Sequence, residues 1–154
     1  MFEVNIYIET SLKGPGTRKG WYAAVVEFQK KDGDTVTRED FVYEQETTYH
    51  KSVLCALIKA LKRLNASCDI TIYTDSEIIR NNVENNLHRW KENGFLTVKG
   101  EPIKNKEEWK ELAKVIAGHK VEFCITKRHF YSEWMRSEAE KKKRIIRNGV
   151  NSKK

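Results

Sequence analysis

Asp75 is the residue whose place in the sequence most clearly suggests chemistry. The stretch from Ile70 to Thr74 alternates apolar and polar side chains, which is the period of a half-buried strand. After Asp75, apolar residues recur every three or four positions, which is the period of a helix. Asp75 therefore sits where a strand ends and a helix begins, and open α/β sheets bind ligands at such points. Alternatively, Asp75 or Ser76 only caps the helix, since both residue types favour that position.

A second carboxylate, Glu9, closes the first strand pattern of the chain. Apolar residues at positions 2, 4, 6 and 8 alternate with the residues of a more polar face, and Glu9 is the last residue of that face. A site that uses Glu9 and Asp75 together requires the two strands to end at the same edge of one sheet.

The other elements follow from the same periods and from turn signals. We expect strands over residues 2–9, 21–29, 35–43, 70–74 and 121–126, and helices over residues 49–64, 77–93, 105–117 and from 132 onward. The Asp32-Gly33 pair predicts a hairpin, so the first three strands should form an antiparallel meander. The strand–helix–strand crossover that follows implies parallel pairing. The predicted fold class is α/β, with a mixed five-stranded sheet (three antiparallel strands, then two parallel) flanked by helices.

Three helix starts carry candidate caps. Thr48 precedes the first helix, and Ser132 opens the last one. Asn105, with Glu108 three residues later, resembles a capping box in which Asn replaces Ser or Thr.

Length and composition indicate one soluble domain. The chain has 154 residues, of which 39% are hydrophobic and 33% charged, so it can bury a substantial core. No apolar run reaches the ~20 residues that cross a bilayer, so we expect no membrane association. The N-terminus lacks the pattern of a secretory signal, and the three scattered cysteines fit reduced thiols. We therefore expect a cytoplasmic protein.

The net charge of +7 is concentrated at the C-terminus. Residues 141–154 carry seven Lys and Arg side chains and no acid, whereas residues 1–140 hold 22 basic and 22 acidic side chains. We therefore divide the chain into a folded domain, residues 1–141, and a basic C-terminal tail, residues 142–154. The tail is suited to phosphate backbones or to a protein partner, and the alternative is a solvated helix end.

A set of short motifs, taken in order, resembles type 1 ribonuclease H over nearly the whole chain. Each motif alone is common, whereas the full set at this spacing is specific. The motifs are Thr47-Thr48, Thr74-Asp75-Ser76, Leu87-His88-Arg89-Trp90-Lys91 with Gly94, Pro102-Ile103-Lys104-Asn105, Trp109 and Lys127-Arg128-His129. The resemblance implies an RNase H-like fold and hydrolysis of the RNA strand of RNA–DNA hybrids.

The resemblance also implies a metal-dependent mechanism. Members of the family hold two Mg²⁺ ions with four carboxylates, and Mg²⁺ prefers oxygen ligands. Two ions ~3.5–4 Å apart activate the attacking water and stabilise the leaving oxygen.

Carried over residue by residue, the resemblance implies a degenerate site. The first carboxylate is Glu9 where the family has Asp, and a shift of ~1 Å can cost ~100-fold in rate. Thr10 replaces a Gly that lets backbone approach the RNA. The second carboxylate, a Glu in the first helix, aligns with Val53, and the third is Asp75.

The fourth carboxylate of the family lies in the last helix. An ungapped alignment places Ala139 there, and a one-residue deletion in the preceding loop places Glu138 instead. His129 matches the loop His that assists turnover in the family. The candidate catalytic set is therefore Asp75, Glu9, Glu138 and His129. The first three also form a candidate site for one Mg²⁺, or for Mn²⁺ in its place.

The resemblance further implies a nucleic-acid surface. Residues 87–106 correspond to the basic protrusion that grips the DNA strand, and they combine cations with aromatic rings suited to stacking. The alternative for Trp90 is core packing. The candidate nucleic-acid-binding residues are Thr10, Lys13, Thr48, Tyr49, His50, Arg89, Trp90, Lys91, Lys99 and Lys104.

Three functions are open at this point. The first is a pseudoenzyme that binds an RNA–DNA hybrid or structured RNA with weak or no hydrolysis, because Val53 replaces a metal ligand. The second is an active Mg²⁺-dependent hybrid endoribonuclease with rearranged carboxylates. The third is a non-catalytic scaffold subunit that binds a protein partner.

Overall fold

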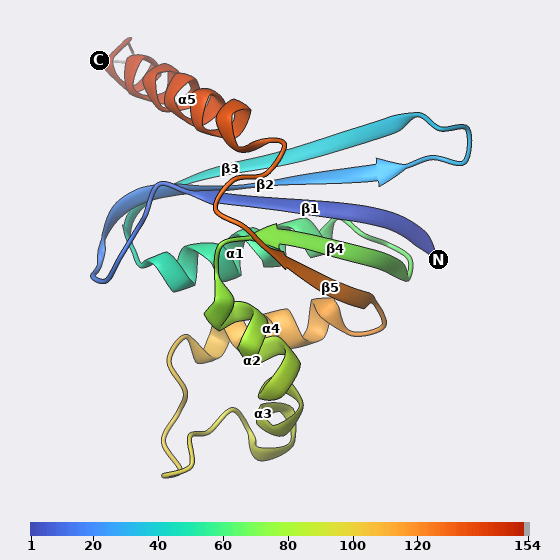
Figure 1. The fold of residues 1–154 in the computed structure, drawn as a ribbon. Helices are drawn as coiled ribbons and strands as arrows, with labels where there is room; N and C mark the ends of the chain where they lie inside the picture. Colours follow the sequence, from blue (N-terminus) through green and yellow to red (C-terminus); the bar gives the residue numbers. More distant parts are fainter. Residues whose placement is uncertain (153–154) are drawn as a thin grey trace.

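A mixed sheet of five strands forms the centre of the fold, in the order β3-β2-β1-β4-β5 (Figure 1). The computed structural model describes the backbone of residues 1–152 and the side chains of residues 1–145. β1 pairs antiparallel with β2, as β2 does with β3, whereas β1 pairs parallel with β4 and β4 with β5. The strands are β1 Phe2–Thr10, β2 Arg18–Gln29, β3 Thr35–Thr47, β4 Cys68–Thr74 and β5 Lys120–Ile125. The predicted fold class is thereby confirmed.

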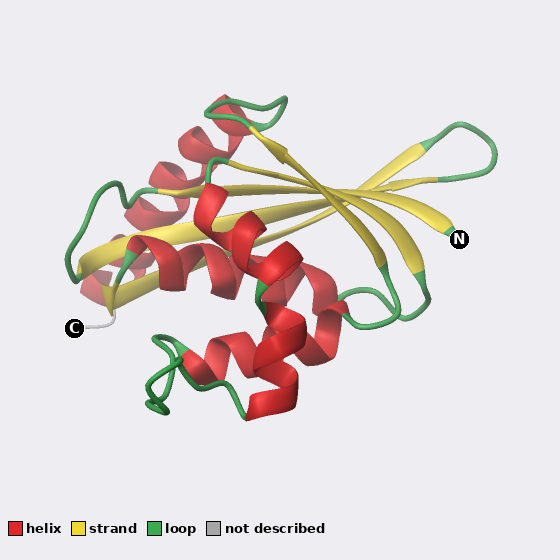
Figure 2. Cartoon of the chain, turned by 60° about the horizontal axis from the view of Figure 1, so that its bottom comes forward, coloured by secondary structure: helices red, strands yellow, loops and turns green. Residues whose placement is uncertain are grey.

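Helices cover both faces of this sheet. Figure 1 shows α1 against one face, with α2, α3 and α4 beyond it, and α5 on the opposite face, and Figure 2 shows helices on both sides of the strands from another direction. The helices are α1 Tyr49–Lys62, α2 Glu77–Asn85, α3 Leu87–Asn93, α4 Lys106–Ile116 and α5 Ser132–Ser152.

The single helix predicted over residues 77–93 is wrong, because it divides into α2 and α3 at Asn86. Asn86 has φ −119° and ψ −26°, so its φ departs from the usual helical value of about −63°, and its side-chain amide donates to Asn82 Oδ1 at 2.8 Å. The backbone hydrogen bonds on both sides of Asn86 are kept, since its N–H donates to the Asn82 carbonyl and its carbonyl accepts from the Trp90 N–H. The predicted helix end is confirmed, since Gly94 caps α3 at φ 80°.

The alternation of β1 determines which core each side chain joins. Val4, Ile6 and Ile8 pack in the main core with the apolar face of α1. Tyr7 lies in a second cluster on the other face, with Met135 and Ala139 of α5. Because side chains alternate along a strand, Glu9 follows Tyr7 on the face that α5 covers.

The candidate caps give mixed results. Thr48 is confirmed, since its hydroxyl accepts from the Lys51 N–H at 3.2 Å. Ser76 caps α2 in the same way. Of the two residues predicted as possible caps there, Asp75 and Ser76, the cap is therefore Ser76. The capping box at Asn105 is wrong: Asn105 is left-handed, with φ 59°, and its side chain makes no cap hydrogen bond among the described residues. Asn tolerates that conformation better than most residues.

Ser132 does not cap α5 in the predicted manner. Its hydroxyl accepts from the backbone N–H of His129 at 2.9 Å and donates to Glu9 Oε1 at 2.7 Å. The start of α5 is therefore tied to the end of β1 and to the loop that precedes the helix.

The C-terminal tail continues α5. The proposed boundary at residue 141 falls within this helix, and the side chains of Arg147, Lys153 and Lys154 lie outside the described residues. Within the described part of the chain, no helix has both the length and the apolar character needed to span a membrane.

Candidate functional site

The ends of β1 and β4 bring Glu9 and Asp75 together. The two strands are neighbours and parallel, so their carboxyl ends lie at one edge of the sheet. A small cavity of about 10 Å³ at this edge is lined by Ile8, Glu9, Thr10, Lys13, Val53, Asp75, Thr126 and Lys127. Val53 enters it from α1 and is only 2% exposed. An apolar side chain of α1 therefore lines the same cavity as the two carboxylates.

Donors from the C-terminal region surround the buried carboxylate of Glu9. Besides the hydroxyl of Ser132 on Oε1, Nη2 of Arg136 lies 2.7 Å from Oε2. Nε2 of His129 lies 3.5 Å from Oε1. Both carboxylate oxygens are therefore held by residues of α5 and the loop before it.

His129 is oriented by the backbone rather than by solvent. Its Nε2 lies 3.0 Å from the carbonyl oxygen of Ile8, to which it must donate, and its Nδ1 accepts from the N–H of Tyr131. This pattern is that of a neutral ring. Burial, the largest influence, lowers the pKa of His129, and it outweighs the Ile8 hydrogen bond and the Glu9 charge, which raise that pKa.

Asp75 has a separate set of partners. Lys13 Nζ lies 3.0 Å from Oδ2, and the Tyr49 hydroxyl donates to Oδ1. Burial alone would raise the pKa of Asp75, but the hydrogen bonds from Tyr49 and Lys13 and the Lys13 charge together lower it. The pKa of Tyr49 is raised, first by burial and then by Asp75.

The donor set at this edge does not fit Mg²⁺. Glu9 is paired with Arg136 and Asp75 with Lys13, so two side-chain cations already balance the two acids. Among the described residues, no group of three His, Cys, Asp or Glu side chains is arranged to hold a metal ion. A divalent ion at this edge would have to displace both cations, and Val53, which lines the same cavity, offers it no oxygen ligand.

The predicted third metal ligand, Glu138, lies elsewhere. It is not among the described residues that line the cavity, and its carboxylate lies 3.5 Å from Nζ of Lys141 on the same helix. Ala139 is fully buried in the cluster beneath α5. The residue of α5 that reaches Glu9 is Arg136, which the sequence interpretation missed. The start of α5 at Ser132 was the available signal, because residues i and i+4 share one helix face.

Two of the residues predicted to contact a nucleic acid, Thr10 and Trp90, are buried. Thr10 is buried, and its hydroxyl donates to the carbonyl of Trp21 at 3.0 Å and accepts from Ser52. Trp90 is 8% exposed, with its ring 5.2 Å from that of Trp109 in an edge-on contact. Neither side chain is free to meet a nucleic acid.

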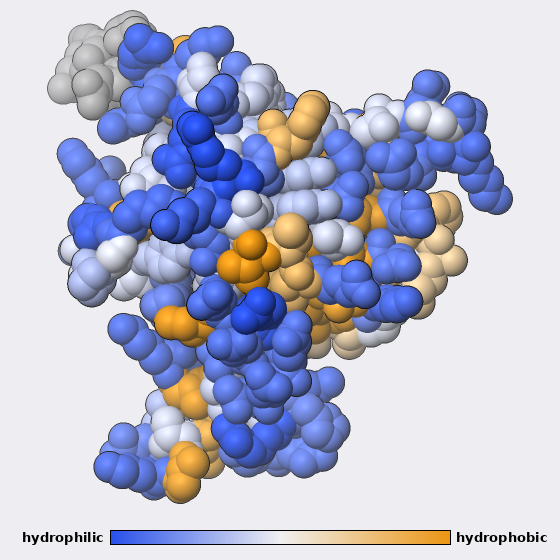
Figure 3. All heavy atoms as spheres, viewed as in Figure 1, coloured by the Kyte–Doolittle hydropathy of each residue, from blue (hydrophilic) through white to orange (hydrophobic). Residues whose placement is uncertain are grey.

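The other predicted contacts are at or near the surface. Arg89, Lys91, Lys99 and Lys104 are exposed, as is Lys13. Figure 3 shows a mostly hydrophilic surface over the lobe of α2, α3 and the loop that follows. His50 and the capping Thr48 are half-buried beside Tyr49 at the start of α1, and burial lowers the pKa of His50. The segment predicted to grip a nucleic acid therefore exposes its cations, whereas its Trp90 ring is buried.

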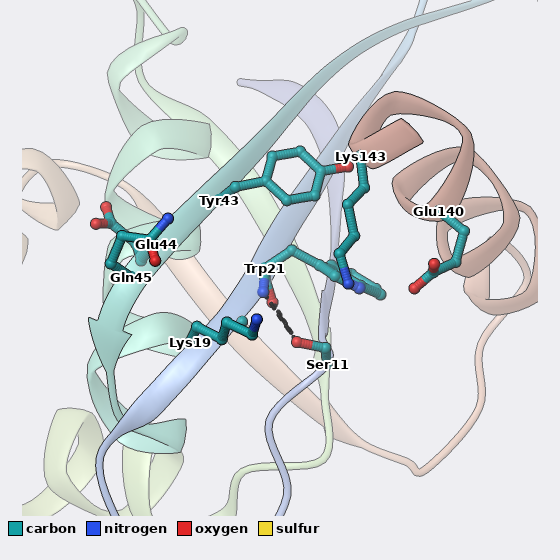
Figure 4. A pocket seen from close by; sticks show the side chains of 9 residues that line it. Ser11, Lys19, Trp21, Tyr43, Glu44, Gln45, Glu140 and Lys143 are labelled. Atoms are coloured by element: carbon teal, nitrogen blue, oxygen red, sulfur yellow. Dashed lines mark hydrogen bonds between the residues drawn. The ribbon is translucent and has the colours of Figure 1, made fainter. Parts of the chain in front are cut away.

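A larger hollow of about 340 Å³ lies between the sheet and α5. Figure 4 shows Trp21 and Tyr43 from the strands facing Lys143 from the helix. Neither Glu9 nor Asp75 lines it, so this hollow is separate from the carboxylate pair.

The sequence is similar to a known family and to solved structures. The RNase H family model matches residues 2–135. The chain is 36% identical over 127 residues to a ribonuclease H of Wolbachia sp. subsp. Drosophila simulans (strain wRi), covering 82% of this chain and 83% of that protein. It is 33% identical over 126 residues to a ribonuclease HI of Neisseria meningitidis serogroup B (strain ATCC BAA-335 / MC58), with the same coverage. LC9-RNase H1, a type 1 RNase H with the type 2 active-site motif, superposes with a TM-score of 0.69 at 26% identity, over 84% of this chain and 64% of that one.

Proposed function

Because the chain belongs to the RNase H family, we propose that it binds RNA–DNA hybrids and hydrolyses their RNA strand weakly or not at all. Hybrids are the substrate class of the family. The exposed cations Arg89, Lys91, Lys99 and Lys104 supply the phosphate contacts that hybrid binding needs.

The pairing of both site carboxylates with side-chain cations carries this proposal. The family mechanism needs carboxylates that are free to hold two Mg²⁺ ions, whereas Arg136 and Lys13 already neutralise Glu9 and Asp75. Val53 adds no ligand to the same cavity. Binding is therefore retained while the chemistry of the cleavage step loses its metals.

A cleavage assay tests the proposal. The intact chain and an Asp75→Asn variant are incubated with a labelled RNA–DNA hybrid in Mg²⁺ and, separately, in Mn²⁺. We expect the intact chain to bind the hybrid, with an affinity that falls as salt rises, and to cleave no faster than the variant. Cleavage that Asp75→Asn abolishes would overturn the proposal, whereas cleavage that survives the substitution marks a contaminating nuclease. Hybrid affinity that is absent or insensitive to salt would favour a scaffold role instead.

A second candidate is an active hybrid endoribonuclease with rearranged carboxylates. The observation in its favour is that relatives 33–36% identical over 82% of the chain carry the name ribonuclease H or HI. This candidate requires Arg136 and Lys13 to leave the carboxylates when Mg²⁺ enters. The same assay decides between the two, since an active enzyme loses cleavage in Asp75→Asn.

We also propose a reducing compartment, the cytoplasm, as the location of the protein, and the free thiols of Cys55, Cys68 and Cys124 support this proposal. The cations at the C-terminal end of α5 add a second candidate contact for phosphate or for a protein partner.

A further inference from the structure

We propose that Lys13 and Arg136 take the place of the divalent ions, so that the carboxylate edge binds a backbone phosphate of the nucleic acid without metal. The inference rests on the proposed function for the identity of the ligand. It adds a phosphate site where the family's metal chemistry would otherwise be, and it names the two side chains that form this site.

At this edge each carboxylate is already paired with a side-chain cation, which suits the binding of an anion such as a phosphate rather than of a metal ion. Four carboxylates with two Mg²⁺ ions have no net formal charge, and the pairs Glu9–Arg136 and Asp75–Lys13 have none either. A phosphate that approaches the edge therefore meets the same overall charge, with nitrogen donors in place of metal ions. Each carboxylate fixes its cation, much as it would fix a metal.

Both cations keep donors for a ligand. A Lys ammonium has three N–H donors and an Arg guanidinium has five, and the ion pairs use Nζ of Lys13 and Nη2 of Arg136. The Lys13 side chain is 51% exposed and that of Arg136 is 42% exposed, whereas Glu9 is buried beneath. The remaining donors can therefore reach an incoming phosphate oxygen, and charge-assisted hydrogen bonds of this kind are among the strong ones.

The buried partners hold this arrangement in advance of binding. Glu9 receives the Ser132 hydroxyl and lies beside the His129 ring, while Asp75 receives the Tyr49 hydroxyl. Fixed acids limit the conformations that Lys13 and Arg136 sample, which reduces the entropy lost when a phosphate binds. Free surface lysines do not have this advantage.

The first test measures hybrid affinity with and without metal. A fluorescein-labelled RNA–DNA hybrid is titrated with the intact chain in EDTA and then in Mg²⁺, with KCl adjusted to hold ionic strength constant. We expect affinities that agree within about twofold, since the phosphate contacts come from side chains. Binding that strengthens about tenfold or more in Mg²⁺ would overturn the inference, because it would show that metal rather than Lys13 and Arg136 holds the phosphate.

The second test removes each cation. Lys13→Gln and Arg136→Gln should each weaken hybrid binding about tenfold and reduce the salt slope of log K by about 0.9. Arg136→Lys, which keeps the charge, should recover most of the affinity. Lys30→Gln serves as the control, because Lys30 is exposed at the far end of β2. Melting curves identify variants that are simply unfolded.

The outcomes separate this inference from the proposed function. If the intact chain binds no hybrid, both fail. If it binds, but the Lys13 and Arg136 variants bind equally well, only the phosphate site fails. If it cleaves the hybrid in a manner that needs Asp75, the proposed lack of hydrolysis fails, and the EDTA comparison still decides whether a metal-free phosphate site exists.

Discussion

At the scale of single residues, the site is defined by which partner each carboxylate has. Glu9 and Asp75 line one cavity, yet Glu9 is bound by α5 and its preceding loop, whereas Asp75 is bound by Lys13 and Tyr49. Two unpaired acids that line one small cavity would repel each other and would each favour a shared cation. Two acids that are each paired with a cation instead stabilise the fold. The two cases differ in whether neutralising one acid lowers or raises the free energy of unfolding.

Asp75→Asn should lower the free energy of unfolding by about 1 kcal/mol near neutral pH, because Lys13 and Tyr49 lose a charged partner. The pKa of Asp75 is lower in the folded protein than its ordinary value of about 3.9. Its stabilising contribution is therefore complete above that value and is lost as pH falls through the folded-state pKa. Urea denaturation should show the gap between the two proteins closing below about pH 4.

The exposed carboxyl of Glu122 provides the control, since Glu122→Gln should change stability little at either pH. A gain in stability for Asp75→Asn at neutral pH would contradict the paired arrangement, because it would mean that repulsion had been relieved.

The positions of Glu9 and Asp75 were predictable from the sequence, whereas the contact of Arg136 with Glu9 was missed, although the predicted start of α5 at Ser132 carried a signal for it. A period of two fixes which side chains share a strand face, and parallel pairing then aligns the two strand ends. The face of α5 depends on where the helix begins, and a shift of one residue turns a side chain by about 100°. Ser132 sets that start through its contacts to His129 and Glu9, which lie far apart in the sequence.

Among the helices and strands, the long segments with a regular apolar period have the predicted structure, whereas the polar residues at helix ends and breaks do not. The strands and α1 follow their apolar periods, because burial of that face dominates their stability. Asn86 and Asn105 are different, since Asn can favour a cap, a break or a left-handed residue, and tertiary packing selects among these.

Substitutions at Asn105 distinguish a left-handed residue from a side-chain cap. Because φ is 59° at this position, Asn105→Gly should keep the free energy of unfolding within about 0.5 kcal/mol. Asn105→Ser should lose about 1 kcal/mol, since Ser pays the steric cost of the left-handed region. Urea denaturation of the two variants measures this order. The reverse order, with Ser equal to Asn and better than Gly, would restore the capping box.

At the scale of the whole molecule, positive charge is available on two separate regions for a nucleic acid. One is the segment with Arg89, Lys91 and Lys99, and the other is the part of α5 where Lys141, Lys143 and Arg144 are exposed. Figure 1 shows the lobe of α2 and α3 on the opposite side of the sheet from α5. The carboxylate edge with its two paired cations receives residues from both sides, Val53 from α1 and Arg136 from α5.

A chain that ends at residue 145 measures how much the C-terminal cations contribute. It lacks Arg147, Lys153 and Lys154, so the salt slope of log K for a hybrid should fall by no more than about 2.7, and binding should persist. Neutralising Arg89, Lys91 and Lys99 in the intact chain should weaken binding more, because these exposed cations lie on the folded surface that we propose contacts the hybrid. The matched control neutralises Lys30, Lys31 and Arg38, which are exposed around the β2–β3 hairpin at the other end of the sheet, and should change affinity least. Fluorescence anisotropy over a salt series measures all three variants. Complete loss of binding on truncation would show instead that the tail alone holds the nucleic acid and that the protrusion does not take part.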